Sequence, residues 1–163
     1  MLFRFGTRNV VAACRDEGVR RLVHVSSPSV AHAGEPLIGA DAQPADPQRA
    51  RGSYARSKAM AEQVALAANS AGLSVIAIRP HLVWGPGDTQ LVERIIDRAR
   101  SGRLLLVDRG HALIDTTYID NAADALACAV DNGPGGRAFV VSNGEPRTVA
   151  ELVARIARAG GGE

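Results

Sequence analysis

The chain has 163 residues, of which 46% are hydrophobic and 22% are charged, and this composition is typical of a globular domain rather than a disordered or collagen-like chain. Its net charge of +2 includes no strongly basic run, which argues against nucleic acid as a partner. No apolar stretch approaches the roughly 20 residues that span a bilayer, and Cys14 and Cys128 lack the spacing of a metal site. We therefore expect one domain, or part of one, in a reduced, cytoplasmic setting, with no membrane span and no metal.

Apolar periodicity and turn residues predict helices and strands that alternate along the chain. Helices are predicted, in chain order, at residues 7–17, 54–71, 89–101, 120–131 and 148–159. Strands are predicted at residues 22–25, 74–78, 104–107, 113–119 and 138–142. Residues 28–52 are rich in glycine and proline, Pro36 included, and are expected to form a long loop. The alternation predicts an α/β fold with a mainly parallel sheet covered on both faces.

Local signals also predict where several helices begin and end. Gly18 and Gly72 are expected at helix C-termini, because glycine readily adopts the left-handed conformation that closes a helix. Asp120 is expected to cap the N-terminus of its helix. Thr148 and Glu151 have the spacing of a capping box at the start of the last helix.

The residues that point most directly to chemistry are two serines, a tyrosine and a lysine. Ser26 and Ser27 follow the strand at 22–25, and the carboxyl ends of strands are where ligands bind in open α/β sheets. Tyr54 and Lys58 are four residues apart on a predicted helix, so they share a face. An ammonium near a phenol lowers the tyrosine pKa from about 10, which suits Tyr54 to general acid–base work. The alternative is an ordinary surface tyrosine and lysine.

Lys58 is also the only lysine among 19 basic residues; the other 18 are arginines. Where a chain uses arginine for nearly every positive charge, the one lysine is a candidate for chemistry that arginine cannot perform, because a compact ammonium differs from a planar guanidinium. The alternative is chance survival of one surface lysine.

Five segments in order carry a resemblance to a known family: 6–11, 19–27, the Tyr54/Lys58 pair, 79–88 and 113–125. Together they resemble the extended short-chain dehydrogenases/reductases, the family of NAD-dependent epimerases, dehydratases and 3β-hydroxysteroid dehydrogenases. Segments 79–88 and 142–146 look more like the hydroxysteroid dehydrogenase branch.

This resemblance implies a fold, an organisation and roles for particular residues. The fold is the C-terminal part of a doubly wound, Rossmann-type parallel sheet plus part of a small substrate lobe. Residues 1–85 would be the distal Rossmann half, and residues 86–163 the substrate-side segments and last sheet strands. The implied catalytic residues are Ser27, Tyr54 and Lys58. The implied contacts to NAD or NADP are Tyr54, Lys58, Pro80, His81 and Val83, and those to the substrate are Ser27, Ser29 and Trp84. Trp84 has core packing as an equal alternative.

The sequence departs from the family pattern in its cofactor half. No strand is followed by a Gly-rich turn and a helix, the arrangement that receives a pyrophosphate, and the glycines at 133–136 lie between a helix and a strand. The resemblance therefore leads us to expect a chain that begins at the family's fourth helix, lacks the first four strands and has a shortened C-terminal lobe.

The expected function is that of an NAD(P)-dependent oxidoreductase acting on a small-molecule secondary alcohol or ketone, for example a 3β-hydroxysteroid. Two alternatives stay open: a sugar-nucleotide epimerase or dehydratase, and a truncated remnant that folds or dimerises without cofactor. The resemblance also implies a homodimer formed through helices 7–17 and 54–71. Cofactor binding by this chain alone is expected to be weak or absent.

Overall fold

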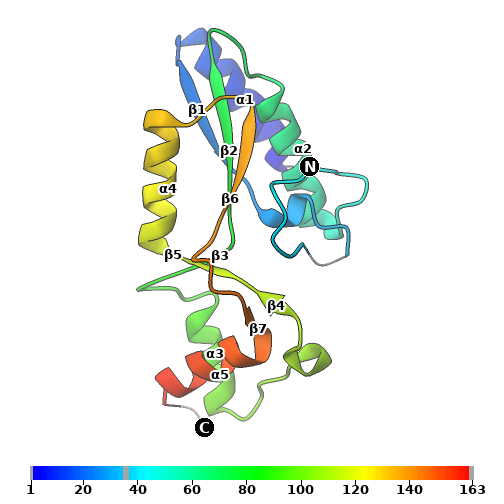
Figure 1. Cartoon of the computed structure of the whole chain (residues 1–163), viewed down its shortest axis with the longest axis vertical. Coiled ribbons are helices and arrows are strands. Elements are labelled where there is room, and N and C mark those ends of the chain that lie inside the picture. The colour runs from blue at the N-terminus through cyan, green and yellow to red at the C-terminus, as the bar shows by residue number, and fades with distance from the viewer. Residues whose placement is uncertain (1, 35–36, 162–163) are drawn as a thin grey trace. The chain divides into compact units, whose positions relative to one another are not determined.

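The computed structural model describes residues 2–34 and 37–161, so Pro36 of the predicted loop and the last two residues lie outside the described part (Figure 1). The chain forms two compact units. The first unit contains Met1–His81 and Ala122–Val141, and the second contains Leu82–Asn121 and Ser142–Glu163. The first unit carries a parallel sheet, and the second is built from two short strand pairs and two helices.

The sheet of the first unit has three parallel strands in the order β1-β2-β6. Its strands are β1 (Arg21–Val25), β2 (Ser74–Pro80) and β6 (Arg137–Val141). The central strand β2 is apolar and buried along most of its length, as expected of a strand covered on both faces. Strand β1 lies at one edge, where β2 is its only strand partner among the described residues. The parallel sheet confirms the expected α/β class.

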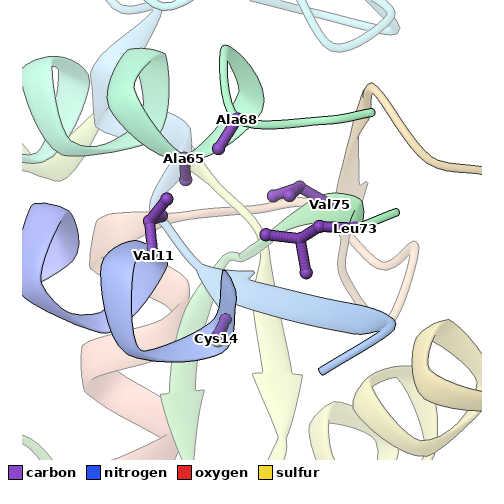
Figure 2. Close-up of a cluster of buried hydrophobic side chains, with 6 residues drawn as sticks. All are labelled: Val11, Cys14, Ala65, Ala68, Leu73 and Val75. Carbon is purple, nitrogen blue, oxygen red and sulfur yellow. The ribbon is translucent and has the colours of Figure 1, made fainter. Parts of the chain in front are cut away.

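Helices cover both faces of this sheet, because successive side chains of β2 point to opposite sides. On one side, α1 (Leu2–Asp16) and α2 (Gly52–Leu66) pack together over Val75. That cluster joins side chains from both helices, β2 and the turn before it: Val11, Cys14, Ala65, Ala68, Leu73 and Val75 (Figure 2). On the other side, Ile76 and Ile78 pack against α4 (Ile119–Asn132).

Helix α2 approaches its neighbours closely because most of its buried positions are small. Ala59, Ala61 and Ala65 have no exposed surface. Ala55 and Ala59 also contact Val30, which belongs to the short 3₁₀ helix η1 (Pro28–Val30) at the start of the long loop. Methyl groups alone therefore separate much of the α2 backbone from the elements beneath it.

The second unit combines two strand pairs with two helices. Strand β3 (Leu82–Trp84) runs parallel to β5 (Thr116–Tyr118), and β4 (Leu113–Ile114) runs antiparallel to β7 (Arg147–Thr148). Helices α3 (Val92–Arg100) and α5 (Val149–Ala159) contact each other. At the end of α5, a Cβ added to Gly160 would lie 2.5 Å from Ile96 of α3, so a larger residue there would force the helices apart.

Two helix boundaries differ from the sequence prediction for local reasons. Helix α2 ends at Leu66 rather than near Ala71, and the Asn69 side chain accepts a hydrogen bond from the Val75 backbone N–H at 2.9 Å. Gly72 is therefore not the residue that closes this helix, whereas Gly18 closes α1 with a φ of 66° as predicted. Helix α3 begins at Val92, three residues after its predicted start, because the Asp88 carboxylate accepts backbone N–H groups at the preceding turn. These hydrogen bonds also lower the pKa of Asp88.

One strand prediction in the second unit is wrong, and another is confirmed only in part. Residues 104–107 form no strand; Leu105 and Val107 are each 91% exposed, and a 3₁₀ segment η2 (Val107–Gly110) follows. The strand predicted at 113–119 is interrupted at Asp115, whose carboxylate accepts the Thr116 backbone N–H at 2.8 Å.

The caps predicted for the last two helices have different outcomes. Asp120 lies inside α4, which begins at Ile119, and so is not its N-cap. Thr148 caps α5 as predicted, by accepting the Glu151 backbone N–H at 3.1 Å. The Glu151 side chain instead forms ion pairs with Arg147 and Arg155.

Candidate active site

The carboxyl end of β1 presents a group of serine hydroxyls. Ser27 is the N-cap of η1, and its hydroxyl oxygen accepts the Ser29 backbone N–H at 3.3 Å and lies 2.9 Å from the Ser29 hydroxyl. Neighbouring Ser26 is buried, and its hydroxyl has no hydrogen-bond partner among the described residues. Ser27 and Ser29 therefore offer two adjacent, partly buried hydroxyls that can bind a polar ligand atom.

Helix α2 brings Lys58 to the same end of β1. The Lys58 ammonium donates a hydrogen bond to the Val25 carbonyl oxygen at 2.7 Å, two residues before Ser27. Tyr54 lies one helical turn earlier in α2, and its side chain is 55% exposed. The structure thus places the lysine of the predicted pair beside the serine segment and leaves the tyrosine accessible to solvent.

Phe3 contacts both members of the pair and is a residue that sequence analysis missed. Its ring centroid lies 5.2 Å from the Lys58 ammonium nitrogen and 6.1 Å from the Tyr54 ring, which meets it edge-on. The ring face attracts the ammonium through a cation–π interaction. Sequence periodicity could not reveal this contact, because α1 begins at Leu2 rather than at the predicted Thr7.

The charges around Lys58 act on its pKa in opposite directions. Burial lowers the pKa of Lys58, while the negative charge of Glu62 raises it. Behind Lys58, burial and the lysine charge lower the pKa of His24 below its usual 6.5, so its imidazole is neutral at pH 7. The Nε2 atom of His24 is buried without a hydrogen-bond partner among the residues described.

A buried ion pair between Glu62 and Arg79 is the second feature that sequence analysis missed. The two side chains are 1% and 2% exposed, and they meet through two parallel contacts, Nε to Oε2 at 2.9 Å and Nη2 to Oε1 at 2.5 Å. The one available signal was the position of Glu62, four residues after Lys58 on the same helix face.

The remaining predicted site residues fall in different units. Pro80 ends β2, and the His81 backbone N–H donates to the Val141 carbonyl at 2.8 Å, so both lie at the carboxyl end of the parallel sheet. Val83 and Trp84 belong to β3 of the second unit. The Trp84 indole N–H donates to the Thr116 hydroxyl at 3.2 Å, and the ring meets Tyr118 edge-on at 5.3 Å.

The second unit also contains an apolar pocket of about 410 Å³. Its walls come from α3, α5 and the strands, and they include Trp84, Leu91, Ile96, Ile114, Leu152 and Ile156. Arg147 and Arg155 supply polar lining, and both form ion pairs with Glu151. A pocket of this size with mostly apolar walls and a few polar groups suits a small hydrophobic molecule. Trp84 therefore lines a pocket and does not lie in a closed core, with 37% of its surface exposed.

A family model decides the assignment: that of the 3-beta hydroxysteroid dehydrogenase/isomerase family matches residues 4–161. The chain belongs to this family. The match confirms the predicted resemblance to extended short-chain dehydrogenases/reductases of the hydroxysteroid dehydrogenase branch.

Several curated proteins are similar to this family member. It is 51% identical to a 2-alkyl-3-oxoalkanoate reductase from Stenotrophomonas maltophilia, with 96% of this chain and 49% of that protein covered. It is 32% identical to a decarboxylating sterol-4-alpha-carboxylate 3-dehydrogenase from Mus musculus, with 93% of this chain and 44% of that protein covered. The chain thus spans about half the length of the curated relatives it matches.

Solved structures of the wider fold also match this family member. A dTDP-glucose 4,6-dehydratase from Streptomyces venezuelae, solved with NAD, has a TM-score of 0.81 at 25% identity and covers 97% of this chain and 49% of its own. The corresponding enzyme from Bacillus anthracis, also solved with NAD, has a TM-score of 0.79 at 23% identity and covers 97% of this chain and 51% of its own. Both likenesses support the Rossmann-type fold.

The described part of the chain has neither a membrane-spanning helix nor a cluster of metal-ligating side chains. Within residues 2–34 and 37–161, no helix is both long and apolar enough to cross a membrane. The same residues contain no group of three or more His, Cys, Asp or Glu side chains that could hold a metal ion.

Proposed function

We propose that this chain supplies the catalytic part of an NAD(P)-dependent oxidoreductase that interconverts a ketone and a secondary alcohol. The observation that carries the proposal is the anchoring of Lys58 to the carboxyl end of β1, beside Ser27 and one turn from an exposed Tyr54. Ligands of open α/β sheets bind at this end of the strands. The 51% identity to a ketone-reducing relative supports the same reaction class.

The residues present fit the nicotinamide end of the cofactor. A lysine ammonium has three N–H donors, and Lys58 uses one of them on Val25, so two donors are left for ribose hydroxyls. Pro80, His81 and Val83 are proposed to contact the nicotinamide, as the family resemblance implies. When bound, NAD(P) supplies or accepts the hydride at the reacting carbon.

The chain's own residues handle the oxygen and its proton. In reduction, the Tyr54 hydroxyl donates its proton to the substrate oxygen, and in oxidation its phenolate accepts that proton. Ser27, with Ser29 beside it, donates a hydrogen bond that holds the substrate oxygen within reach of Tyr54.

The proposed substrate class is a 3-oxoalkanoate that carries alkyl chains. The relative with 51% identity is a reductase of 2-alkyl-3-oxoalkanoates, and others reduce a farnesyl-bearing quinoline oxide or oxidise sterol carboxylates. Two of these names specify large hydrocarbon groups, a farnesyl chain and a sterol, and the third specifies an alkyl chain. The pocket lined by Trp84, Ile96 and Ile156 is proposed to bind such a hydrocarbon chain, because most of its walls are apolar.

A chimera tests this function directly. This chain would replace the matching segment of the Stenotrophomonas maltophilia reductase, and oxidation of NADH or NADPH would be followed with a 2-alkyl-3-oxoalkanoate. We expect turnover that depends on the ketone. A folded chimera that binds NAD but reduces no ketone would contradict the proposal. Conversion of dTDP-glucose instead would favour the epimerase or dehydratase alternative, and loss of all activity would favour the non-catalytic remnant.

Binding of a hydrocarbon chain to the proposed pocket can be tested on the 163-residue protein itself, because Trp84 is the only tryptophan of the protein. Titration with dodecanoate is expected to change Trp84 fluorescence with saturation, and butanoate is expected to bind at least about tenfold more weakly, since each buried methylene contributes about 0.8 kcal/mol. The substitution Ile96→Asp is expected to abolish the dodecanoate response.

Val130→Asp is the matched control, because Val130 is an exposed apolar residue of α4 outside the pocket. Circular dichroism of both variants would check that they fold. Equal responses to the two fatty acids, or an unchanged response in Ile96→Asp, would argue against an alkyl-binding pocket.

We further propose that the chain forms homodimers through α1 and α2. Val11 of α1 is buried in the core, whereas the neighbouring Val10 is 50% exposed. The helix pair therefore leaves apolar surface uncovered. Light scattering at tens of micromolar is expected to give a dimer mass for the wild type and a monomer mass for Val10→Asp. Leu105→Asp, which changes a 91% exposed leucine of the second unit, is expected to stay dimeric. A Val10→Asp dimer would point to another surface, with the edge that β1 forms in the described sheet as the first candidate.

A further inference from the structure

The buried Glu62–Arg79 pair costs free energy to bury and so calls for a role beyond packing. Both charges are removed from water, and a hydrophobic pair of similar volume often stabilises a protein equally well or better. The two side chains meet in the bidentate geometry that fixes a guanidinium and a carboxylate in one relative orientation. The arrangement therefore fixes the relative orientation of Glu62 and Arg79 rather than adding stability.

The pair connects two segments that carry predicted site residues, α2 and β2, with the loop around Gln43. Glu62 lies on α2, one turn after Lys58 and two turns after Tyr54. Arg79 lies on β2, immediately before Pro80. The remaining edge of the Arg79 guanidinium donates, through Nη1, to the Gln43 carbonyl at 2.7 Å. This hydrogen bond links the long loop that follows η1 to β2.

We propose that Glu62 and Arg79 are positioning residues for the Tyr54–Lys58 pair, holding α2 and the loop around Gln43 in fixed register against the carboxyl end of β2. The assignment rests on the proposed function, because it concerns the same catalytic site. Neither residue is assigned contact with substrate or cofactor.

Electrostatics supports this role through Lys58. The groups that face the lysine are His24 from β1, Glu62 from its own helix and the Phe3 ring from α1. Since His24 is neutral at pH 7, Glu62 is the anion that counters the effect of burial on the pKa of Lys58. Arg79 fixes that carboxylate in place on its other side.

The experiment uses the fact that Lys58 is the only lysine in the chain. Labelling with lysine enriched in ¹³C and ¹⁵N gives a single labelled side-chain amine, and its NMR titration reports the pKa of Lys58 directly. Replacing Glu62 by Gln is expected to lower this pKa by about 0.5–1 unit, because the compensating charge is lost. Glu93→Gln, on α3 of the second unit, is the matched control and is expected to leave the pKa unchanged.

A second variant covers the case in which Glu62→Gln does not fold. The double variant Glu62→Gln/Arg79→Met leaves no unpaired buried charge and is expected to fold. Its Lys58 pKa is also expected to fall, since Glu62 is the charged neighbour that raises it. A Lys58 pKa within about 0.2 unit of wild type in a folded variant would overturn the positioning role.

The chimeric reductase supplies the kinetic readout. Glu62→Gln is expected to lower kcat at least about tenfold with a smaller change in the KM for the ketone, and to shift the pH profile of kcat, whereas Glu93→Gln changes neither. A purely structural role would lower the amount of folded enzyme and leave the pH profile of the remainder unchanged. A shifted Lys58 pKa in the 163-residue chain together with a folded but inactive chimera would contradict the proposed function, while an unshifted pH profile in an active chimera would contradict the positioning role alone.

Discussion

Tyr54→Phe is expected to remove nearly all turnover from the chimeric reductase, by about 100-fold to 10,000-fold in kcat, the range associated with loss of a general acid or base. The phenol is the group proposed to transfer the proton, and phenylalanine keeps the ring that packs against Phe3 while lacking that proton. Affinity for NAD is expected to stay within a few-fold of the parent. Steady-state kinetics together with a cofactor titration measures both quantities.

The chain offers a matched control for this substitution, because Tyr118 is its only other tyrosine. Tyr118→Phe keeps the edge-on contact with Trp84 and removes a hydroxyl from the second unit, so kcat is expected to change less than about threefold. Lys58→Arg is expected to be nearly inactive as well, since a planar guanidinium does not reproduce a compact ammonium. A Tyr54→Phe variant that loses less than tenfold, about 1.4 kcal/mol of barrier, would exclude the acid–base role.

The 163-residue chain by itself is expected to bind NAD or NADP only at millimolar concentrations or more weakly. The sequence contains no Gly-rich turn between a strand and a helix to bind the pyrophosphate. Each charge-assisted hydrogen bond lost in this way is worth roughly 1.5–3 kcal/mol, and two or three of them move a micromolar dissociation constant to the millimolar range.

Calorimetric titration of the isolated chain and of the chimera would test this expectation side by side. The chimera is expected to bind with a dissociation constant in the micromolar range, which controls for the integrity of the nicotinamide end. Micromolar binding by the isolated chain would mean that the cofactor site lies elsewhere and that this chain is competent without an added segment.

Sequence analysis predicted features that depend on neighbouring residues and missed those that depend on distant ones. Thr148 caps α5 through a residue three positions away, and Tyr54 and Lys58 share a helix face through the helical repeat, so both could be deduced locally. The partners in the Glu62–Arg79 pair are 17 residues apart, and Gln43 lies 36 residues from Arg79. Nothing in local spacing indicates that these three segments meet.

The wrong strand at 104–107 has a different cause. Leu105 and Val107 are apolar, and such residues favour buried strands. In the second unit each is instead 91% exposed, so the apolar character of the segment led to a wrong prediction. Phe3 was missed because its contacts depend on the first turn of α1, which the predicted boundary left out. The described structure therefore corrects the sequence prediction chiefly where tertiary contacts outweigh local preference.

The buried alanines of α2 restrict how this helix can be re-engineered. Because Ala59, Ala61 and Ala65 have no exposed surface, an added methyl group has no space to enter and the backbone must move. Overpacking of this kind typically costs 1–3 kcal/mol, and any outward movement of α2 would carry Tyr54 and Lys58 with it. A mutant library aimed at new substrates should therefore keep these three alanines constant and vary solvent-facing positions such as Arg56.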